Sequence, residues 1–259
     1  MSDTHVTAES LASLPGIRHV FLSRYGGVSD GIYAGLNCGL GSNDDTNKVT
    51  ENRSRAAQAV GVAPDRLRTL YQVHSARVID ADTDWAGTPL EADALVCTTP
   101  GTAIGILAAD CAPVLFADPE ARIIGAAHAG WHGALKGVVG ATIDAMLSRG
   151  AQADRIRATV GPCIGPKSYE VGPEFPAAFL KQDSENAQFF KQQQESDRLL
   201  FNLPAYVHSR LRLAGVSRSN ITGHDTYSNN NFFSYRRSCH RSEPDYGRNL
   251  SLITLLEDA

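Results

Sequence analysis

Two short apolar runs, residues 103–109 and 123–127, each end beside a side chain that can bind a metal ion. Short apolar runs of this kind, bounded by turn residues, predict buried β-strands. Cys111 follows the first run and His128 follows the second. A fold that buries both runs is expected to place them side by side, so that the thiol, the imidazole and the glycine-rich exits form one pocket.

A third candidate ligand, His74, ends an apolar run that begins at Tyr71. Zinc binds thiolate and imidazole in near-tetrahedral geometry, and three protein ligands leave its fourth position open for chemistry. His74, Cys111 and His128 are therefore the expected metal ligands and the expected catalytic residues. The open fourth position favours a metalloenzyme over a structural zinc finger.

Charge and cysteine usage exclude several classes of protein. The formal net charge of −4 provides no basic surface for a nucleic acid or an anionic membrane, and no apolar stretch is long enough to span a bilayer. The five cysteines are odd in number and include no Cys-x-x-Cys pair, which disfavours a disulfide framework. The N-terminal residues, with Asp3 and Glu9, lack the apolar segment of a secretory signal. We therefore expect a cytoplasmic protein.

Helix and strand patterns mix without strict alternation, which predicts a single α+β domain over residues 1–259 with a flexible N-terminus over residues 1–15. The polar stretch 181–198 is expected to be a solvated helix or a mobile insertion, and 232–237 a partly exposed loop. Strands are expected at 17–22, 93–97, 103–109, 123–127, 155–160 and 250–255, with one or two between 67 and 79 and one near 221, and helices at 44–60, 135–147 and 204–213.

Three arginines are candidates for binding an anion. Arg24 adjoins a glycine turn, whose amides can help to bind a phosphate. Arg236 follows aromatic residues that could stack on a planar base, and Arg237 is its neighbour. A surface salt bridge is an equally good interpretation of each one taken singly. Arg24 and Arg236 are the residues we expect to bind substrate phosphate, and the expected stacking residues are Phe232, Phe233 and Tyr235.

Two further polar residues adjoin the expected ligands. Asp110 precedes Cys111, and its side chain is expected to accept hydrogen bonds from loop amides, with orientation of a ligand or substrate as the alternative. His132 follows His128 by four residues, so on a continuous helix the two would share a face, and the glycines at 130 and 133 make a turn an equally good interpretation. His132 is therefore expected beside the site or on the surface.

Six motifs, collinear from about Arg24 to the end of the chain, resemble the YfiH/YlmD family, whose members are also called laccase-domain proteins or multicopper polyphenol oxidases. Two of them contain Cys111 and His128. The motifs are Gly26-Gly27-Val28-Ser29, Asp110-Cys111-Ala112-Pro113, Gly125-Ala126-Ala127-His128-Ala129-Gly130-Trp131, Gly161-Pro162-Cys163-Ile164-Gly165, Tyr169-Glu170-Val171-Gly172 and Phe233-Ser234-Tyr235-Arg236-Arg237.

The resemblance implies a four-layer α/β/β/α sandwich and a zinc site at His74, Cys111 and His128. It also implies a purine nucleoside phosphorylase that acts on adenosine, inosine and methylthioadenosine, with adenosine deaminase activity. The partners would then be small molecules, a nucleoside and phosphate, while the oligomeric state is left open. The chain departs from the family pattern at His132, where a basic residue such as Arg is usual, and at Asp225, where Cys is frequent.

Other functions are kept as alternatives. A copper-dependent, laccase-like polyphenol oxidase would need a trinuclear cluster, whose ligands usually form His-x-His motifs, and the sequence has none. Cu²⁺ could still replace Zn²⁺, because it binds nitrogen ligands more tightly. A Cys–His hydrolase, linked within the family to peptidoglycan precursor editing, would use Cys111 as nucleophile and His128 as base. A zinc-stabilised binding protein without catalytic activity is the remaining alternative.

Overall fold

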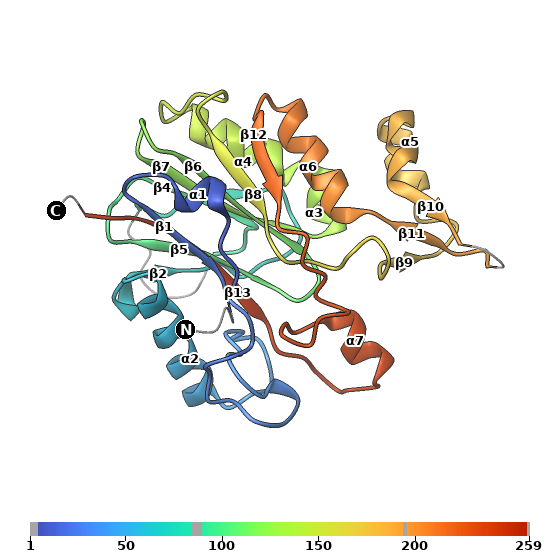
Figure 1. Ribbon diagram of the computed structural model, residues 1–259, viewed down its shortest axis with the longest axis horizontal. Coiled ribbons are helices and arrows are strands. Elements are labelled where there is room, and N and C mark those ends of the chain that lie inside the picture. Colours follow the sequence, from blue (N-terminus) through green and yellow to red (C-terminus); the bar gives the residue numbers. More distant parts are fainter. Residues whose placement is uncertain (1–4, 84–89, 194–195, 258–259) are drawn as a thin grey trace.

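Two sheets lie face to face at the centre of the computed structural model, which describes residues 5–83, 90–193 and 196–257 (Figure 1). The larger sheet has the strand order β12-β8-β6-β7-β4-β3, and the smaller has the order β1-β13-β5-β2. Their bounds are β12 Arg218–Ile221, β8 Arg157–Val160, β6 Ala112–Asp118, β7 Ile123–Ala129, β4 Ala94–Cys97, β3 Val78–Asp80, β1 Ile17–Phe21, β13 Asn249–Leu255, β5 Ala103–Ala108 and β2 Leu67–Arg68.

A third, three-stranded sheet of order β10-β11-β9 extends to one side of the molecule, next to α5 (Figure 1). Its strands are β10 Phe190–Gln192, β11 Leu199–Phe201 and β9 Glu170–Val171. The helices are α1 Glu9–Ala12, α2 Thr46–Ala59, α3 Trp131–Lys136, α4 Val138–Leu147, α5 Ala177–Gln182, α6 Leu203–Leu213 and α7 Tyr235–His240, with 3-10 turns η1 Gly31–Tyr33, η2 Pro64–Arg66 and η3 Ser184–Phe189.

The central strands are apolar on both faces, because both faces are covered. In β7, Ile124 and Ala126 belong to the core between the two sheets, whereas Ile123 and Ala127 face the core beneath α4 and α6. Successive side chains of a strand point to opposite faces, so one continuous apolar run serves both cores. A third core lies between the smaller sheet and α2. Helices therefore cover the outer faces of both sheets (Figure 1).

The described elements confirm the α+β class expected from the sequence, but two details of the strand assignment are wrong. The runs 103–109 and 123–127 do not form neighbouring strands, because β5 and β7 belong to different sheets. The strands beside β7 are β6 and β4, and β6 is not among the strands expected from the sequence. Pro113, near its start, cannot donate to a strand ladder. Pro113 lies opposite His128 in the β6–β7 pair, and its carbonyl accepts a hydrogen bond from Gly161.

Three other expectations also need correction. The expected helix 135–147 is two helices, α3 and α4, because Gly137 takes a left-handed conformation (φ 93°) between them. Residues 232–237 are loop only over 232–234, because α7 begins at Tyr235, and Phe232 and Phe233 are buried. The polar stretch 181–198 holds the end of α5, η3 and β10, and residues 194–195 within it lie outside the described residues.

The expected flexible N-terminus, residues 1–15, is described from His5 onward. Leu11 and Leu14 are buried in the core between the sheets, and the amide of Ala8 donates to His19 Nε2 at 2.8 Å. The helix expected at 44–60 is α2, and the Asp45 side chain caps its start by accepting from the amide of Asn47. In the described part of the chain, no helix is both long and apolar enough to cross a membrane.

Candidate functional site

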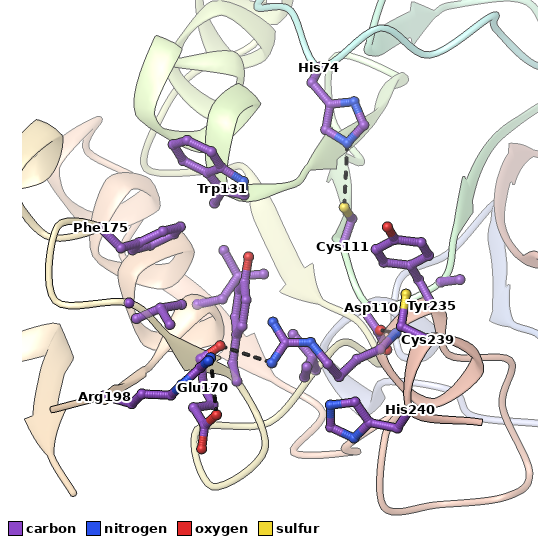
Figure 2. Close-up of a pocket in the computed structure, with 17 residues that line it drawn as sticks. His74, Asp110, Cys111, Trp131, Glu170, Phe175, Arg198, Tyr235, Cys239 and His240 are labelled. Atoms are coloured by element: carbon purple, nitrogen blue, oxygen red, sulfur yellow. Dashed lines mark hydrogen bonds and ion pairs between the residues drawn. The ribbon is translucent and has the colours of Figure 1, made fainter. Parts of the chain in front are cut away.

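The three expected metal ligands, His74, Cys111 and His128, lie together. Their ligand atoms are all within 4.8 Å of one another, and Cys111 Sγ is 3.8 Å from His74 Nε2 (Figure 2). His128 is buried, Cys111 is half-buried and His74 is exposed. A group open on one side is therefore present, as the sequence predicted, and it could hold a metal ion.

Strand pairing explains how residues distant in sequence meet. Cys111 directly precedes β6, and the antiparallel register pairs Ala112 with Ala129, so Cys111 lies beyond the end of β7, near His128. Gly130 follows that end, and a Cβ at this position would stand 2.7 Å from Cys111 Sγ and 2.9 Å from His74 Cδ2. Position 130 must therefore be glycine, because Cys111 and His74 approach its backbone too closely to leave room for a side chain.

His74 reaches the site from a loop and not from a strand end, which corrects the expectation. It lies between β2 and β3 and has a left-handed backbone (φ 57°). Asp110, just before Cys111, also has a positive φ (84°). Such conformations are uncommon outside glycine and cost free energy, so the surrounding hydrogen bonds must maintain them.

The carboxylate of Asp93 anchors both histidines. It accepts hydrogen bonds from the amides of Val73, His74 and Ser75 at 3.2, 2.9 and 2.6 Å, and from the Ser75 hydroxyl at 2.7 Å. The same carboxylate is 2.9 Å from His128 Nδ1, which leaves Nε2 of that ring for a metal. Burial opposes the charge of Asp93, but the bonds from His128 and Ser75 lower its pKa well below the usual range. One side chain therefore positions two ligands, as metal-binding histidines require.

Without a metal, the site favours a thiolate–imidazolium pair. Burial alone would raise the pKa of the Cys111 thiol, but the charge of His128 and hydrogen bonds from both histidines lower it to about 6. Burial would lower the pKa of His128, but the Cys111 thiolate and Asp93 raise it to about 9. A thiolate is the form in which cysteine binds metal or attacks as a nucleophile.

The donor set fits a zinc ion. A tetrahedral zinc with bonds of about 2.3 Å to sulfur and about 2.0 Å to nitrogen separates its ligand atoms by roughly 3.5 Å. The 3.8 Å between Cys111 Sγ and His74 Nε2 lies close to that separation. One thiolate, two imidazoles and an outer carboxylate on His128 are a usual combination for such a site.

A cavity of about 600 Å³ opens beside Cys111 and His74 (Figure 2). Its lining includes three aromatic side chains, Trp131, Tyr169 and Phe175, which we call the aromatic wall. The Phe175 ring lies 4.8 Å from Trp131 and 6.1 Å from Tyr169, centroid to centroid. The volume lies within the range of small-molecule sites, and the apolar lining with a few polar groups is typical of them.

Arg236, on α7, lines the same cavity. Its Nη1 donates to the carbonyl of Glu170 at 2.8 Å, and its guanidinium lies 5.4 Å from the centre of the Tyr169 ring. Tyr235, half exposed, and Cys239 lie on the same helix and also line the cavity (Figure 2). The expected anion-binding and stacking roles of Arg236 and Tyr235 are thus compatible with their positions.

Asp110 holds α7 in place. Its carboxylate accepts from the Arg236 amide at 2.6 Å and from the hydroxyls of Thr226 and Ser234 at 2.7 and 3.0 Å. Burial raises the pKa of Asp110, and these donors act in the opposite direction. The interpretation of Asp110 as an acceptor of loop hydrogen bonds agrees with this geometry.

Arg24 and Arg237 do not line this cavity. Arg24 donates from Nε and Nη2 to the carbonyl of Ala34 at 3.0 and 2.8 Å and stacks on Phe233, at 4.6 Å from the ring centre. The buried Arg237 donates to backbone carbonyls, including that of Thr226 at 2.7 Å. Both line a small separate cavity of about 100 Å³, and Phe233 lies with them.

Sequence reasoning missed Asp93 and the aromatic wall as parts of the site. The sequence places Asp93 at the beginning of an expected strand. An acidic residue directly before the buried strand β4 could have indicated a carboxylate with a specific partner. Trp131 and Tyr169 stand in the quoted motifs without an assigned role. His132 is exposed and lies 3.6 Å from Trp131, centroid to centroid, so it stands beside the site, as expected.

Comparison with known proteins identifies close relatives. The family model described as multi-copper polyphenol oxidoreductase laccase matches residues 18–256. A purine nucleoside phosphorylase of Deinococcus radiodurans is 47% identical over 165 residues, and the match spans 63% of this chain and 63% of that protein. The match therefore covers under two thirds of that relative. Purine nucleoside phosphorylase YfiH of Escherichia coli is 37% identical over 247 residues, 93% of this chain and 95% of that protein.

Two solved structures share the whole fold. Protein NMB0706 of Neisseria meningitidis superimposes with a TM-score of 0.87 at 35% identity, covering 98% of this chain and 100% of that one. YlmD of Geobacillus stearothermophilus superimposes with a TM-score of 0.85 at 28% identity, covering 96% of this chain and 94% of that one. The α+β domain is thus common to this chain and to both of these proteins.

Proposed function

Because the chain belongs to the YfiH/YlmD family, we propose that it is a zinc-dependent purine nucleoside phosphorylase of adenosine, inosine and methylthioadenosine, with adenosine deaminase activity. One observation carries the proposal: a thiolate and two imidazoles stand at the edge of a cavity of about 600 Å³ with a polar and aromatic lining. The relatives named purine nucleoside phosphorylase support the reaction class. We further propose that the fold is the four-layer α/β/β/α sandwich of this family, which the helices outside both sheets support.

His74, Cys111 and His128 would hold the metal, and Asp93 would orient the two histidines. Zinc, when bound, supplies a Lewis acid that polarises an oxygen atom and lowers the pKa of a coordinated water. Cu²⁺ is the alternative metal, because its affinity for nitrogen ligands exceeds that of Zn²⁺.

The chain's own residues would bind the nucleoside in the large cavity. In phosphorolysis a phosphate oxygen forms a bond to the ribose C1′ while the bond from C1′ to the purine nitrogen breaks. The bonding electrons pass to the base, which then takes up a proton, and ribose 1-phosphate is the other product. Arg236 is placed to stabilise negative charge on the departing base or on phosphate. Tyr235 and the aromatic wall offer flat apolar surfaces for the purine.

Arg24 is not retained in the proposed substrate site, because its guanidinium is bonded to Ala34 and lines another cavity. Phe232 and Phe233 are not retained as stacking residues, because both are buried and outside the lining of the large cavity.

A Cys–His hydrolase is the second candidate, and a specific observation favours it. The thiolate–imidazolium pair of Cys111 and His128 is the state that such a nucleophile needs. Ordinary laccase chemistry lacks comparable support: among the described residues, one group of three or more possible metal ligands is found, whereas a multicopper oxidase also needs a trinuclear cluster.

The test is to incubate zinc-loaded protein with adenosine, inosine and methylthioadenosine, with and without phosphate, and to identify the products by chromatography. We expect phosphate-dependent release of free base and ribose 1-phosphate. Cys111→Ala should abolish release, whereas Cys239→Ser, at the other thiol that lines the cavity, should retain zinc. Absence of base release from zinc-loaded protein at saturating phosphate contradicts the proposal. Inhibition by zinc of a hydrolysis seen in metal-free protein would favour the hydrolase.

A further inference from the structure

A second cavity, of about 270 Å³, adjoins the three ligands. His74, Cys111 and His128 line it on one side, and Tyr246 and Arg248 also belong to its lining. His74 and Cys111 line the large cavity too, but Arg248 does not. The ligand group therefore adjoins two cavities, one lined by the aromatic wall and one lined by Arg248.

The Arg248 side chain is held in one position by its surroundings. Its guanidinium lies 4.4 Å from the centre of the Tyr246 ring, and Nη1 donates to the Tyr246 carbonyl at 3.2 Å. Gly39 packs against its stem so closely that a Cβ there would stand 2.7 Å from Arg248 Cδ. The backbone is fixed as well, since the Arg248 amide donates to Asn37 Oδ1 at 2.9 Å.

This position leaves most of the guanidinium without a protein acceptor. Of the three guanidinium nitrogens of Arg248, Nη1 has a hydrogen-bond acceptor among the described residues, and Nε and Nη2 have none there. Arg248 also forms no ion pair with a carboxylate in the described part of the chain. Asp245, three residues earlier, accepts hydrogen bonds from the Tyr33 hydroxyl at 2.7 Å and the Asn43 amide at 2.8 Å. Burial opposes the charge of Asp245, but these donors and the Arg248 charge lower its pKa, without a direct ion pair between the two side chains. A half-buried, prepositioned arginine with free donors is suited to a tetrahedral oxyanion.

We propose that the second cavity binds inorganic phosphate through Arg248, next to the nucleoside cavity with which it shares His74 and Cys111. This inference rests on the proposed phosphorylase function. Phosphorolysis needs two substrates at one carbon, and the attacking oxygen must approach C1′ from the face opposite the departing base. Two cavities that share His74 and Cys111 provide separate places for the two substrates. The phosphate of the product, ribose 1-phosphate, has the same chemistry and would leave from the same site.

The first measurement is direct: inorganic phosphate is titrated into the zinc-loaded protein by calorimetry. For Arg248→Gln we expect phosphate binding to weaken roughly tenfold or more, because hydrogen bonds to a charged group are lost. Zinc content should not change. Arg212→Gln, an exposed arginine on α6, is the matched control and should bind phosphate normally. Unchanged phosphate binding in Arg248→Gln overturns the proposal.

The second measurement is kinetic. Arg248→Gln should raise the KM for phosphate while leaving the KM for inosine near its original value, and it should spare adenosine deamination, which consumes water and not phosphate. Gly39→Ala, which displaces the arginine without removing it, should raise the KM for phosphate less. The Gly39→Ala variant keeps the proposal testable if Arg248→Gln does not fold. A rise in the KM for inosine alone would place Arg248 with the nucleoside and overturn the proposal.

The two hypotheses fail in different ways. If the unmodified protein releases no base, the phosphorylase function is wrong, and the phosphate titration still decides whether Arg248 forms an oxyanion site. If base is released but phosphate binding and the phosphate KM do not depend on Arg248, the function stands and this site does not.

Discussion

The ligand wall and the aromatic wall of the large cavity are built by different physical means. The ligand wall (His74, Cys111, His128 and Asp93) combines residues at the ends of central strands with His74 from the loop between β2 and β3, and it reaches the large cavity through His74 and Cys111. Directional hydrogen bonds to the Asp93 carboxylate fix the 73–75 loop and His128. The aromatic wall comes from the start of α3 and from loops beside β9 and is held by ring packing. Directional hydrogen bonds therefore fix the group that could hold a metal ion, whereas ring packing shapes the cavity beside it.

The largest expected effect is on the ligand wall itself. Cys111→Ala removes the one thiolate, so zinc affinity should fall by more than the roughly 10- to 100-fold that loss of an outer partner costs. Metal analysis after dialysis against a weak chelator measures this, with the thermal transition of metal-free protein as a check on folding. Full zinc retention would mean that the three residues are not the ligand set.

A smaller loss is expected from Asp93→Asn. The amide keeps the size of the side chain but not the charge that holds His128 and the 73–75 loop, so zinc affinity should fall about 10- to 100-fold. Competition with a chromogenic chelator gives the affinity. Asp225→Asn, at another carboxylate that binds loop amides but lies outside both cavities that adjoin the ligands, serves as the control. Equal losses of zinc affinity in the two variants would show that Asp93 has no specific role in holding the ligands.

Acid should weaken the fold that supports both walls through His19, which is remote from the ligands. Burial lowers the pKa of His19 to about 4. Between pH 6.5 and about 4 the unfolded chain therefore binds more protons at this residue, and stability falls as the pH falls. Linkage predicts a loss of about 2 kcal/mol in the free energy of unfolding on going from pH 7 to pH 5.

Urea unfolding of metal-free protein at the two pH values measures this loss. The drop should be about 2 kcal/mol smaller in His19→Gln, which does not titrate in this range. An identical pH dependence in the two proteins would exclude His19 as the cause.

The smallest effect is expected at the aromatic wall. Phe175→Leu removes ring contact but keeps apolar volume, so the KM for inosine should rise by about fivefold, corresponding to about 1 kcal/mol. Zinc content should stay at the original level. Zinc loss in this variant would show that the aromatic wall also supports the three ligands, which contradicts the separation of the two walls.

The sequence could predict that His74, Cys111 and His128 form a group, because cysteine and histidine have specific metal chemistry wherever they occur, but it did not predict that Asp93 supports them. The three ligands, the α+β class and most central strands followed from local patterns. The sequence could not predict β6. Pro113 has no N–H to donate, which argues against a strand unless the fold is known to need no hydrogen bond from that position. The sequence also could not exclude Arg24, since whether a guanidinium is free or bonded to Ala34 depends on contacts that only the folded chain makes.

Asp93 has a consequence for how the proposed metal would be acquired. The carboxylate orders the 73–75 loop and His128 within the polypeptide itself, so the entropy of arranging the ligands is lost during folding and not during metal uptake. Zinc fingers, by contrast, fold only when the ion arrives. A zinc ion that binds as proposed would meet a prearranged receptor in this chain, so uptake should be a simple bimolecular step and a chelator should remove the ion while leaving the polypeptide folded.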